Sequence, residues 1–222
     1  MKTLASLFLL LSCGLAQVAD KANSGYKTPE GRQAVAKGLI APDRDNRQKP
    51  EELVQAMELQ PGMVVADIGT GAGYMLPFLS RAVGPTGRVI GEDIQDDFLA
   101  MARSKAAADK LANVTFVKGS EKDPALPAGA VDVALALDSY HHYDYPQQML
   151  AGIRNGLKPG GHLVIVEYYK RSGAMANGRA LEHIRLDAPD VIKEVEAAGF
   201  RLLSQREHIK NSQYMVVFTP LR

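Results

Sequence analysis

The sequence contains no tryptophan and a single cysteine, Cys13, among its 222 residues. One cysteine excludes an intrachain disulfide framework and a zinc site built from cysteine pairs. The 26 basic and 25 acidic residues almost cancel, so the chain lacks the basic footprint of a nucleic-acid-binding protein. No apolar run approaches the ~20 residues that a membrane-spanning helix needs. The ordinary apolar and charged fractions predict a globular protein with a normal core, and the length suits one domain.

The first 20 residues differ in character from the rest. Lys2 supplies a positive start, Leu4–Leu11 is apolar apart from Ser6, and residues 14–16 (Gly-Leu-Ala) form a cleavage site of the Ala-x-Ala type that ends at Ala16. These are the parts of a secretory signal peptide, so we expect residues 1–20 to be a signal segment and the protein to be periplasmic or secreted. The Leu-Leu-Ser sequence before Cys13 also resembles a bacterial lipoprotein signal, which would anchor the exported protein to a membrane. An uncleaved N-terminal helix is the alternative.

Residues 21–49 are expected to precede the main domain. The polar stretch Lys21–Tyr26 is interpreted as a tether. Thr28 as N-cap and Pro29 in the first turn predict a helix that ends at Leu39. The charged residues 41–49 are interpreted either as a solvated loop or as a lid that closes over a ligand.

Residues 50–222 alternate between strand and helix patterns. The expected strands are 63–68, 88–94, 113–119, 131–137, 162–168, 200–208 and 214–219. The expected helices between them are 50–59, 76–83, 96–111, 146–157 and 188–198. This order predicts a Rossmann-like, doubly wound α/β fold with a seven-stranded, mostly parallel sheet and helices on both faces. The last strand is expected to be antiparallel to its neighbour.

The chain is organised around the turn that follows the first expected strand, where the spacing is Asp67-x-Gly69-x-Gly71-x-Gly73. Glycine lets the backbone turn sharply and lets a ligand lie directly on it. Open α/β sheets bind ligands at such strand ends. Tyr74 occupies the position where the dinucleotide fingerprint requires a third glycine, which argues against nicotinamide binding. The alternative is a glycine-rich turn that binds no ligand.

Two carboxylates, Glu92 and Asp93, end the second expected strand. Asp93 follows Gly69 by 24 positions (93 − 69), close to the ~20 at which an acidic residue reaches a ribose in nucleotide-binding α/β folds. The alternative is a pair of solvated charges. The position after the glycine turn favours a ribose-binding role for Asp93.

A polar and aromatic cluster, residues 138–145, follows the fourth expected strand. His141 and His142 are candidate general bases, because histidine titrates near neutral pH. The alternative is that they only shape the pocket wall. Asp138, both histidines and His183 include metal-ligand types, but they form no compact ligand motif, so we expect no metal site.

Three stretches carry a resemblance to a known family: the glycine turn, the sequence Gly91–Ile94, and the Leu-Lys-Pro-Gly-Gly sequence of residues 157–161. Together they resemble class I S-adenosylmethionine (SAM) dependent methyltransferases. The paired histidines are similar to the small-molecule branch that includes ubiquinone and menaquinone biosynthesis. The resemblance covers roughly residues 51–219 and implies methyl transfer from SAM to an unidentified small-molecule acceptor.

The resemblance also implies which residues hold the cofactor: Asp67, Gly69, Gly71, Gly73, Asp93, Ile94, Ser120, Glu121 and Asp138. Ser120 departs from the family pattern, in which an aspartate usually lines the adenine. That departure and the signal segment keep a second interpretation open, an exported nucleoside- or SAM-binding protein without catalysis. A nicotinamide-dependent oxidoreductase is the third.

Overall fold

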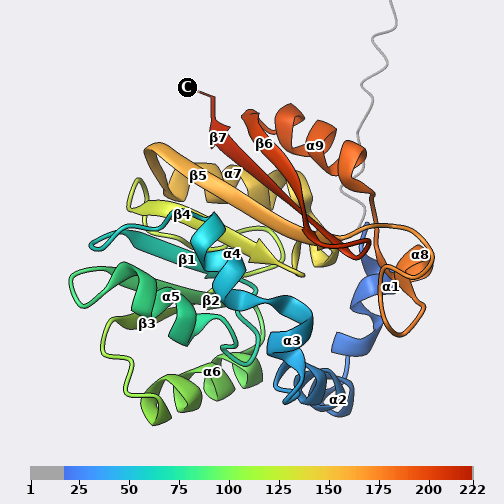
Figure 1. The fold of residues 1–222 in the computed structure, drawn as a ribbon, viewed down its shortest axis with the longest axis horizontal. Helices are drawn as coiled ribbons and strands as arrows, with labels where there is room; N and C mark the ends of the chain where they lie inside the picture. The colour runs from blue at the N-terminus through green and yellow to red at the C-terminus, as the bar shows by residue number, and fades with distance from the viewer. Residues whose placement is uncertain (1–17, 222) are drawn as a thin grey trace, which may run out of the picture.

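The computed structural model describes residues 18–221, so Cys13 and most of the predicted signal segment lie outside the described residues. The fold is built on one seven-stranded sheet of order β3-β2-β1-β4-β5-β7-β6 (Figure 1). Its strands are β1 (Val64–Ile68), β2 (Arg88–Asp93), β3 (Val114–Lys118), β4 (Val131–Leu137), β5 (Leu157–Tyr168), β6 (Phe200–Ile209) and β7 (Gln213–Pro220). Strands β1 to β5 run parallel, and β7 pairs antiparallel with both β5 and β6. The predicted Rossmann-like α/β fold is confirmed.

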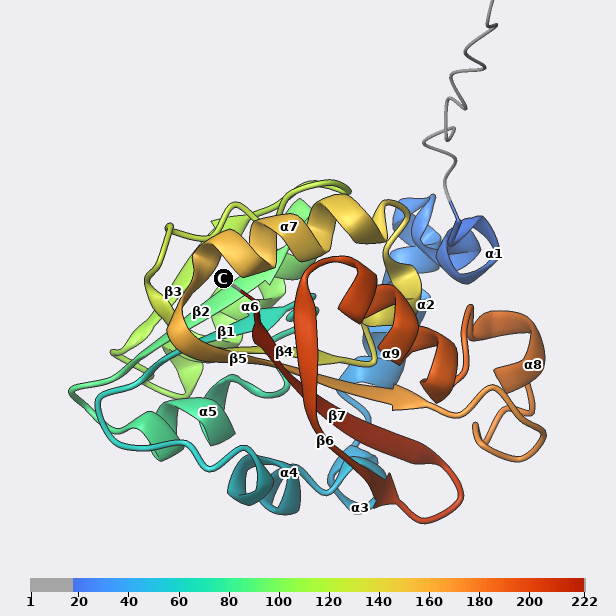
Figure 2. The same ribbon diagram turned by 90° about the horizontal axis from the view of Figure 1, so that it is seen from above.

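Helices cover both faces of the sheet (Figure 2). Helices α4 (Pro50–Ala56), α5 (Leu76–Val83) and α6 (Asp96–Ala108) pack on one face, and α7 (Pro146–Gly156) and α9 (Ala188–Ala197) pack on the other. Leu53 and Leu79 are fully buried on the first face, as are Leu150 and Ile153 on the second. Each such side chain contributes about 1.5–3 kcal/mol on burial, so both apolar layers hold the helices against the strands.

The central strands β1 and β4 place the functional end of the fold. Val65 pairs with Val133 in a parallel ladder between them. The chain leaves β1 toward α5 on one face and leaves β4 toward α7 on the other. A crevice therefore opens at the carboxyl ends of β1 and β4, which is where open α/β sheets bind ligands.

Short helical segments gather at that end of the sheet (Figure 1). They are α1 (Asp20–Asn23), the 3₁₀ turn η1 (Ser24–Tyr26), α2 (Pro29–Leu39), α3 (Arg44–Gln48), the 3₁₀ turn η2 (Tyr140–His142) and α8 (Ala180–His183). Thr28 caps α2 as predicted, with its hydroxyl accepting from the Gly31 amide at 3.1 Å.

Two predictions for this N-terminal region were wrong. The tether Lys21–Tyr26 is helical, and residues 41–49 contain α3 instead of a continuous loop. In α3, the buried Gln48 donates from Nε2 to Gln213 Oε1 at 3.0 Å. Helices this short are not stable alone, and contacts with distant residues hold them in place.

Most other predicted boundaries agree within a few residues, but β5 begins earlier than expected. The strand starts at Leu157, which pairs with Val131, and a register shift follows before Val133. The register shift accommodates the Pro-Gly-Gly segment, residues 159–161. The residues that were expected to form a turn before β5 are therefore the first part of the strand. Within residues 18–221, no helix has both the length and the apolar character to span a membrane.

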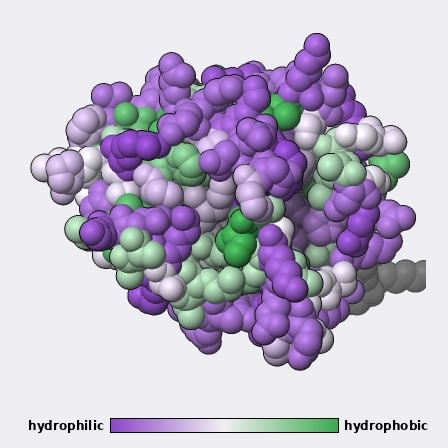
Figure 3. All heavy atoms as spheres, turned by 60° about the horizontal axis from the view of Figure 1, so that its bottom comes forward, coloured by the Kyte–Doolittle hydropathy of each residue, from purple (hydrophilic) through white to green (hydrophobic). Residues whose placement is uncertain are grey.

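Figure 3 shows the face at the bottom of Figure 1, where α2 and α6 lie. Hydrophilic residues cover most of it, and the hydrophobic residues occur in small separate groups. An extended apolar patch of the kind that marks a protein or membrane interface is not seen on this face.

Candidate functional site

A cavity of about 400 Å³ lies at the carboxyl ends of β1, β2 and β4, in the range of small-molecule sites. Gly69 and Gly71 line its floor. Gly71 has a φ of 55°, and a Cβ there would lie 2.9 Å from Leu39 Cδ1. The left-handed backbone at Gly71 favours glycine, and a side chain there would have to displace the tip of Leu39.

Gly73 has a different place from the other two glycines. It is not among the residues that line the cavity. Its φ is 82°, and a Cβ there would lie 3.1 Å from Ala102 Cα in α6. The absence of a side chain at Gly73 therefore serves the packing of the turn against α6.

Asp67 supports the turn from beneath. Its side chain is buried, and Oδ2 accepts from the Thr70 hydroxyl at 2.7 Å. Burial raises the pKa of Asp67 to about 6, although the Thr70 hydrogen bond and Arg44 oppose the shift. Asp67 does not line the cavity.

Asp93 lines the cavity and ties the end of β2 to the glycine turn. Its Oδ2 accepts from the Gly71 amide and its Oδ1 from the Gln95 amide, both at 2.9 Å. Burial raises the pKa of Asp93 to about 6 against these hydrogen bonds. The following residue, Ile94, also lines the cavity.

Glu92 is a cavity residue that sequence reasoning missed. Its Oε2 accepts from the Gly69 amide at 3.1 Å, whereas Oε1 is buried and has no partner among the described residues. Burial, followed by the charge of Asp93, raises the pKa of Glu92 well above its ordinary value. Two adjacent acidic residues at a strand end were the only signal, and they were equally compatible with solvated charges.

Ser120 and Glu121 line the cavity from the loop after β3. The Ser120 hydroxyl accepts from the amides of Asp123 at 3.1 Å and Lys122 at 3.3 Å. The Ser120 side chain therefore stabilises its own loop.

Asp138 follows β4 and lines the cavity in a left-handed conformation, with a φ of 52°. Its Oδ1 accepts from Gln213 Nε2 at 2.6 Å. Burial and the neighbouring Glu167 carboxylate raise the pKa of Asp138 to about 7.

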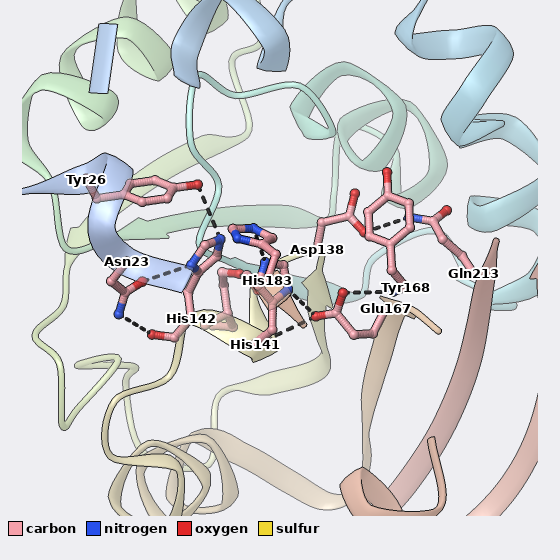
Figure 4. Close-up of polar contacts among 11 residues, drawn as sticks. Asn23, Tyr26, Asp138, His141, His142, Glu167, Tyr168, His183 and Gln213 are labelled. Carbon is pink, nitrogen blue, oxygen red and sulfur yellow. Dashed lines mark hydrogen bonds and ion pairs between the residues drawn. The ribbon is translucent and has the colours of Figure 1, made fainter. Parts of the chain in front are cut away.

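The two candidate bases have different hydrogen-bond partners (Figure 4). His142 lines the cavity, with Nδ1 2.8 Å from Asn23 Oδ1 and Nε2 3.3 Å from the Tyr26 hydroxyl. Burial and two neighbouring histidines lower the pKa of His142 well below its ordinary value, so its imidazole is neutral at pH 7.

His141 does not line the cavity. Its Nδ1 lies 2.6 Å from Glu167 Oε2, and its Nε2 lies 3.1 Å from His183 Nε2. The tertiary structure thus brings His183 to the histidine pair. Glu167 comes from the carboxyl end of β5.

The N-terminal segment contributes cavity residues for which the sequence carries no periodic signal: Asn23, Tyr26 and Arg44. Lys27 and Arg32 also line the cavity, but they pair with Asp20 and Asp97. Arg44 lies 3.9 Å over the Tyr74 ring and makes no ion pair within residues 18–221. Arg44 is therefore a cation available to an anionic ligand.

Residues 18–20, which the sequence assigns to the signal segment, contact the domain. Ala19 is 2% exposed, and its amide donates to Asp144 Oδ1 at 3.1 Å. Asn23 Nδ2 donates to Asp144 Oδ2 at 3.0 Å. Cleavage after Ala16 would leave these contacts intact.

Comparison with known proteins gives one family match, to a model described as a methyltransferase domain, over residues 65–161. That stretch holds the glycine turn, Asp93, Ser120, Asp138 and the histidine pair. Arg44, Glu167 and His183 lie outside it.

Two curated relatives and one solved structure are similar to the chain. A ubiquinone/menaquinone biosynthesis C-methyltransferase (UbiE) of Ectopseudomonas mendocina is 30% identical over 53% of this chain and 46% of its own. A nocamycin O-methyltransferase of Saccharothrix syringae is 32% identical over 50% of this chain and 40% of its own. The chain therefore spans less than half the length of these two relatives. A SAM-dependent methyltransferase structure from Aquifex aeolicus superposes with a TM-score of 0.77 at 28% identity, over 83% of this chain and 96% of its own.

Proposed function

We propose, from the methyltransferase-domain match over residues 65–161, that this protein transfers a methyl group from SAM to a small-molecule acceptor. The observation that carries the proposal is the cavity itself. A glycine turn whose left-handed backbone at Gly71 disfavours a side chain and a ribose-type carboxylate at Asp93 face one cavity at the carboxyl end of the sheet.

The residues of the cavity fit this cofactor. SAM supplies a methyl group activated by a positively charged sulfonium. Asp93 would accept the ribose hydroxyls, because each carboxylate oxygen has a lone pair beyond the one used by a backbone amide. Glu92 and Asp138 place further acidic groups around the turn, and such groups favour a cation when ionised. Arg44 would pair with the carboxylate of the methionine moiety.

The chain's part in methyl transfer is to orient the two reactants, because the cofactor carries the activated group. His142 lies on the wall of the cavity and is neutral, so it would not repel the sulfonium. Its lowered pKa makes it a weak base.

The wall also favours an apolar acceptor. Tyr26, Phe98 and Met149 line the cavity beside the polar groups. The names of the two curated relatives describe methyl transfer to a carbon in one case and to an oxygen in the other. These relatives support a small-molecule acceptor here, and they leave open the attacking atom.

The test is calorimetric titration of the protein, expressed from its full sequence, with SAM and separately with NADH. Micromolar binding of SAM without binding of NADH is expected. Binding of NADH alone would favour the oxidoreductase instead. Binding of SAM without turnover of any acceptor in a broad panel would favour the exported binding protein without catalysis. Ser120 supports that interpretation, because its hydroxyl bonds to the backbone of its own loop.

We also propose that the protein is exported, from the signal-like composition of residues 1–16. Mass spectrometry of the protein from a bacterial periplasmic or membrane fraction tests this. A mature chain that begins at Gln17 indicates signal cleavage, and a lipid on Cys13 indicates a membrane anchor. Retention of Met1 in a cytosolic fraction would contradict export.

A further inference from the structure

We propose that His141, His142 and His183 form a binding site for one divalent transition-metal ion of the zinc type. The ligand nitrogens of these three side chains all lie within 4.8 Å of one another. Figure 4 shows the three rings close to one another. These histidines were named from the sequence, but no metal site was expected, because His183 lies more than 40 residues from the histidine pair.

The nitrogen spacing suits a shared ion. The Nε2 atoms of His141 and His183 are 3.1 Å apart. Two nitrogens bound tetrahedrally to zinc at about 2.0–2.1 Å stand roughly 3.3 Å apart. The His142 ring lies 4.0 Å from the His141 ring and 5.4 Å from the His183 ring, centroid to centroid. Small side-chain rotations would bring all three nitrogens to one ion.

Glu167 prepares His141 as a ligand. Its Oε2 lies 2.6 Å from His141 Nδ1, and the two side chains are 1% and 4% exposed. A carboxylate only accepts, so His141 carries a proton on Nδ1, and Nε2 is the nitrogen left to bind a metal. Glu167 is itself fixed, because its oxygens also accept from the amides of His141 at 3.1 Å and Tyr168 at 2.8 Å. Metal-binding histidines typically donate their second nitrogen to such a carboxylate.

Asn23 prepares His142 in the same way. The amide nitrogen of Asn23 donates to Asp144 Oδ2 and to the His142 carbonyl, both at 3.0 Å. These bonds assign the amide oxygen to the position 2.8 Å from His142 Nδ1. His142 therefore also carries its proton on Nδ1 and its lone pair on Nε2.

The ligand set selects the class of metal. Three imidazole ligands favour zinc, copper or nickel over magnesium and calcium, which prefer oxygen ligands. Three protein ligands also leave one coordination position open, as in catalytic zinc sites. An acceptor hydroxyl bound there would lose its proton to solvent water more easily, so the reaction would not depend on His142, which is then a ligand, as a base. That use rests on the proposed methyl transfer, whereas the metal site does not.

The test uses the full-length sequence, purified through a tag without histidine and stripped with a chelator. Zinc is then titrated by calorimetry and counted by elemental analysis, and cobalt replaces zinc to report tetrahedral coordination in its visible spectrum. We expect one ion per chain. His183→Gln should lower zinc affinity by more than about 100-fold, and Glu167→Gln by about 10–100-fold, as loss of an outer partner typically does.

His162→Gln and His208→Gln are the matched controls, because these two histidines lie outside the cluster. Both should bind zinc like the wild type. His183 is partly exposed, and circular dichroism will show whether its variant folds; His142→Gln serves as a second variant. The proposal fails if the wild type binds no more zinc than His183→Gln, or if the controls lose as much. A SAM titration on the same sample separates this failure from failure of the proposed methyl transfer.

Discussion

At the scale of single residues, Asp93 both stabilises the glycine turn and faces the proposed ligand-binding cavity. Both of its oxygens accept from backbone amides, so it holds the glycine turn in place. The same carboxylate faces the cavity, where burial raises its pKa to about 6. Its charge state therefore changes within an accessible pH range.

Asp93→Asn should weaken SAM binding by about 1.5–3 kcal/mol at pH 7.5, the range for hydrogen bonds to a charged group. Wild-type affinity should fall as the pH drops through about 6, because a protonated carboxyl accepts hydroxyl hydrogen bonds less well. Calorimetric titrations between pH 5 and 8 measure both effects. The variant should show a shallower pH dependence, and parallel curves would contradict the ribose role of Asp93.

Arg44→Ala should also weaken SAM, by about 1.5–3 kcal/mol, because it removes the cation proposed for the methionine carboxylate. Arg81→Ala is the matched control, since Arg81 is exposed and pairs with Glu51 away from the cavity. The same titration compares the two variants. Equal SAM affinities of the two variants would show that Arg44 does not bind the methionine carboxylate.

At the scale of elements, the N-terminal segment depends on the site that it covers. Helix α1 has four residues and η1 has three, too few for independent stability. Asp144 holds α1 through the Ala19 amide and the Asn23 side chain. Arg32 holds α2 through Asp97 at 2.6 Å. The segment and the loop after β4 therefore order one another.

Asp144→Ala should lower the free energy of unfolding by about 1–3 kcal/mol, because it leaves buried donors without an acceptor. Urea denaturation measures the loss, and limited proteolysis should cut the N-terminal segment faster. Asp190→Ala is the control, since Asp190 makes an exposed ion pair with Lys193. A variant as stable and as resistant as this control would refute the coupling.

At the scale of the whole molecule, the carboxyl groups buried near the cavity lower the free energy of unfolding when they are ionised. Asp67, Glu92 and Asp93 are buried at one end of the sheet, and burial raises the pKa of all three. A carboxyl whose pKa is higher in the folded state stabilises the fold when protonated, and that stabilisation is lost as the pH rises through the folded pKa. Binding of a cation to the folded state alone would restore stability by mass action.

Asp93→Asn tests this cost in the ligand-free protein. Its stability relative to wild type should be more favourable at pH 7.5 than at pH 5, because only the wild type carries the ionised carboxylate above about 6. The comparison between the two proteins cancels the opposing effect of His142 and His183, whose pKa values are lowered. Urea unfolding at both pH values measures it, and an unchanged difference would contradict the assignment.

The sequence by itself determined the strand order along the chain, both helical layers and the glycine turn with Asp93. These features follow from local patterns, since apolar runs, alternation with helices and glycine spacing act over a few residues. Local pattern also placed the histidine pair at the end of β4. It could not assign α1 and α3, which are too short and polar to show a period.

Only the tertiary structure decided which distant residues meet at the site. Gln213 reaches Asp138 across 75 positions, and Asn23 reaches His142 across 119. His183 and Glu167 converge on His141 from separate segments, and Arg44 enters from a helix that the sequence did not reveal. Such contacts depend on how the chain closes in space, and a single sequence carries no local signal for them. Short-range sequence patterns were therefore enough to predict the architecture of the fold. The residues that meet at the cavity wall could be identified only from the tertiary structure, because they are far apart in the sequence.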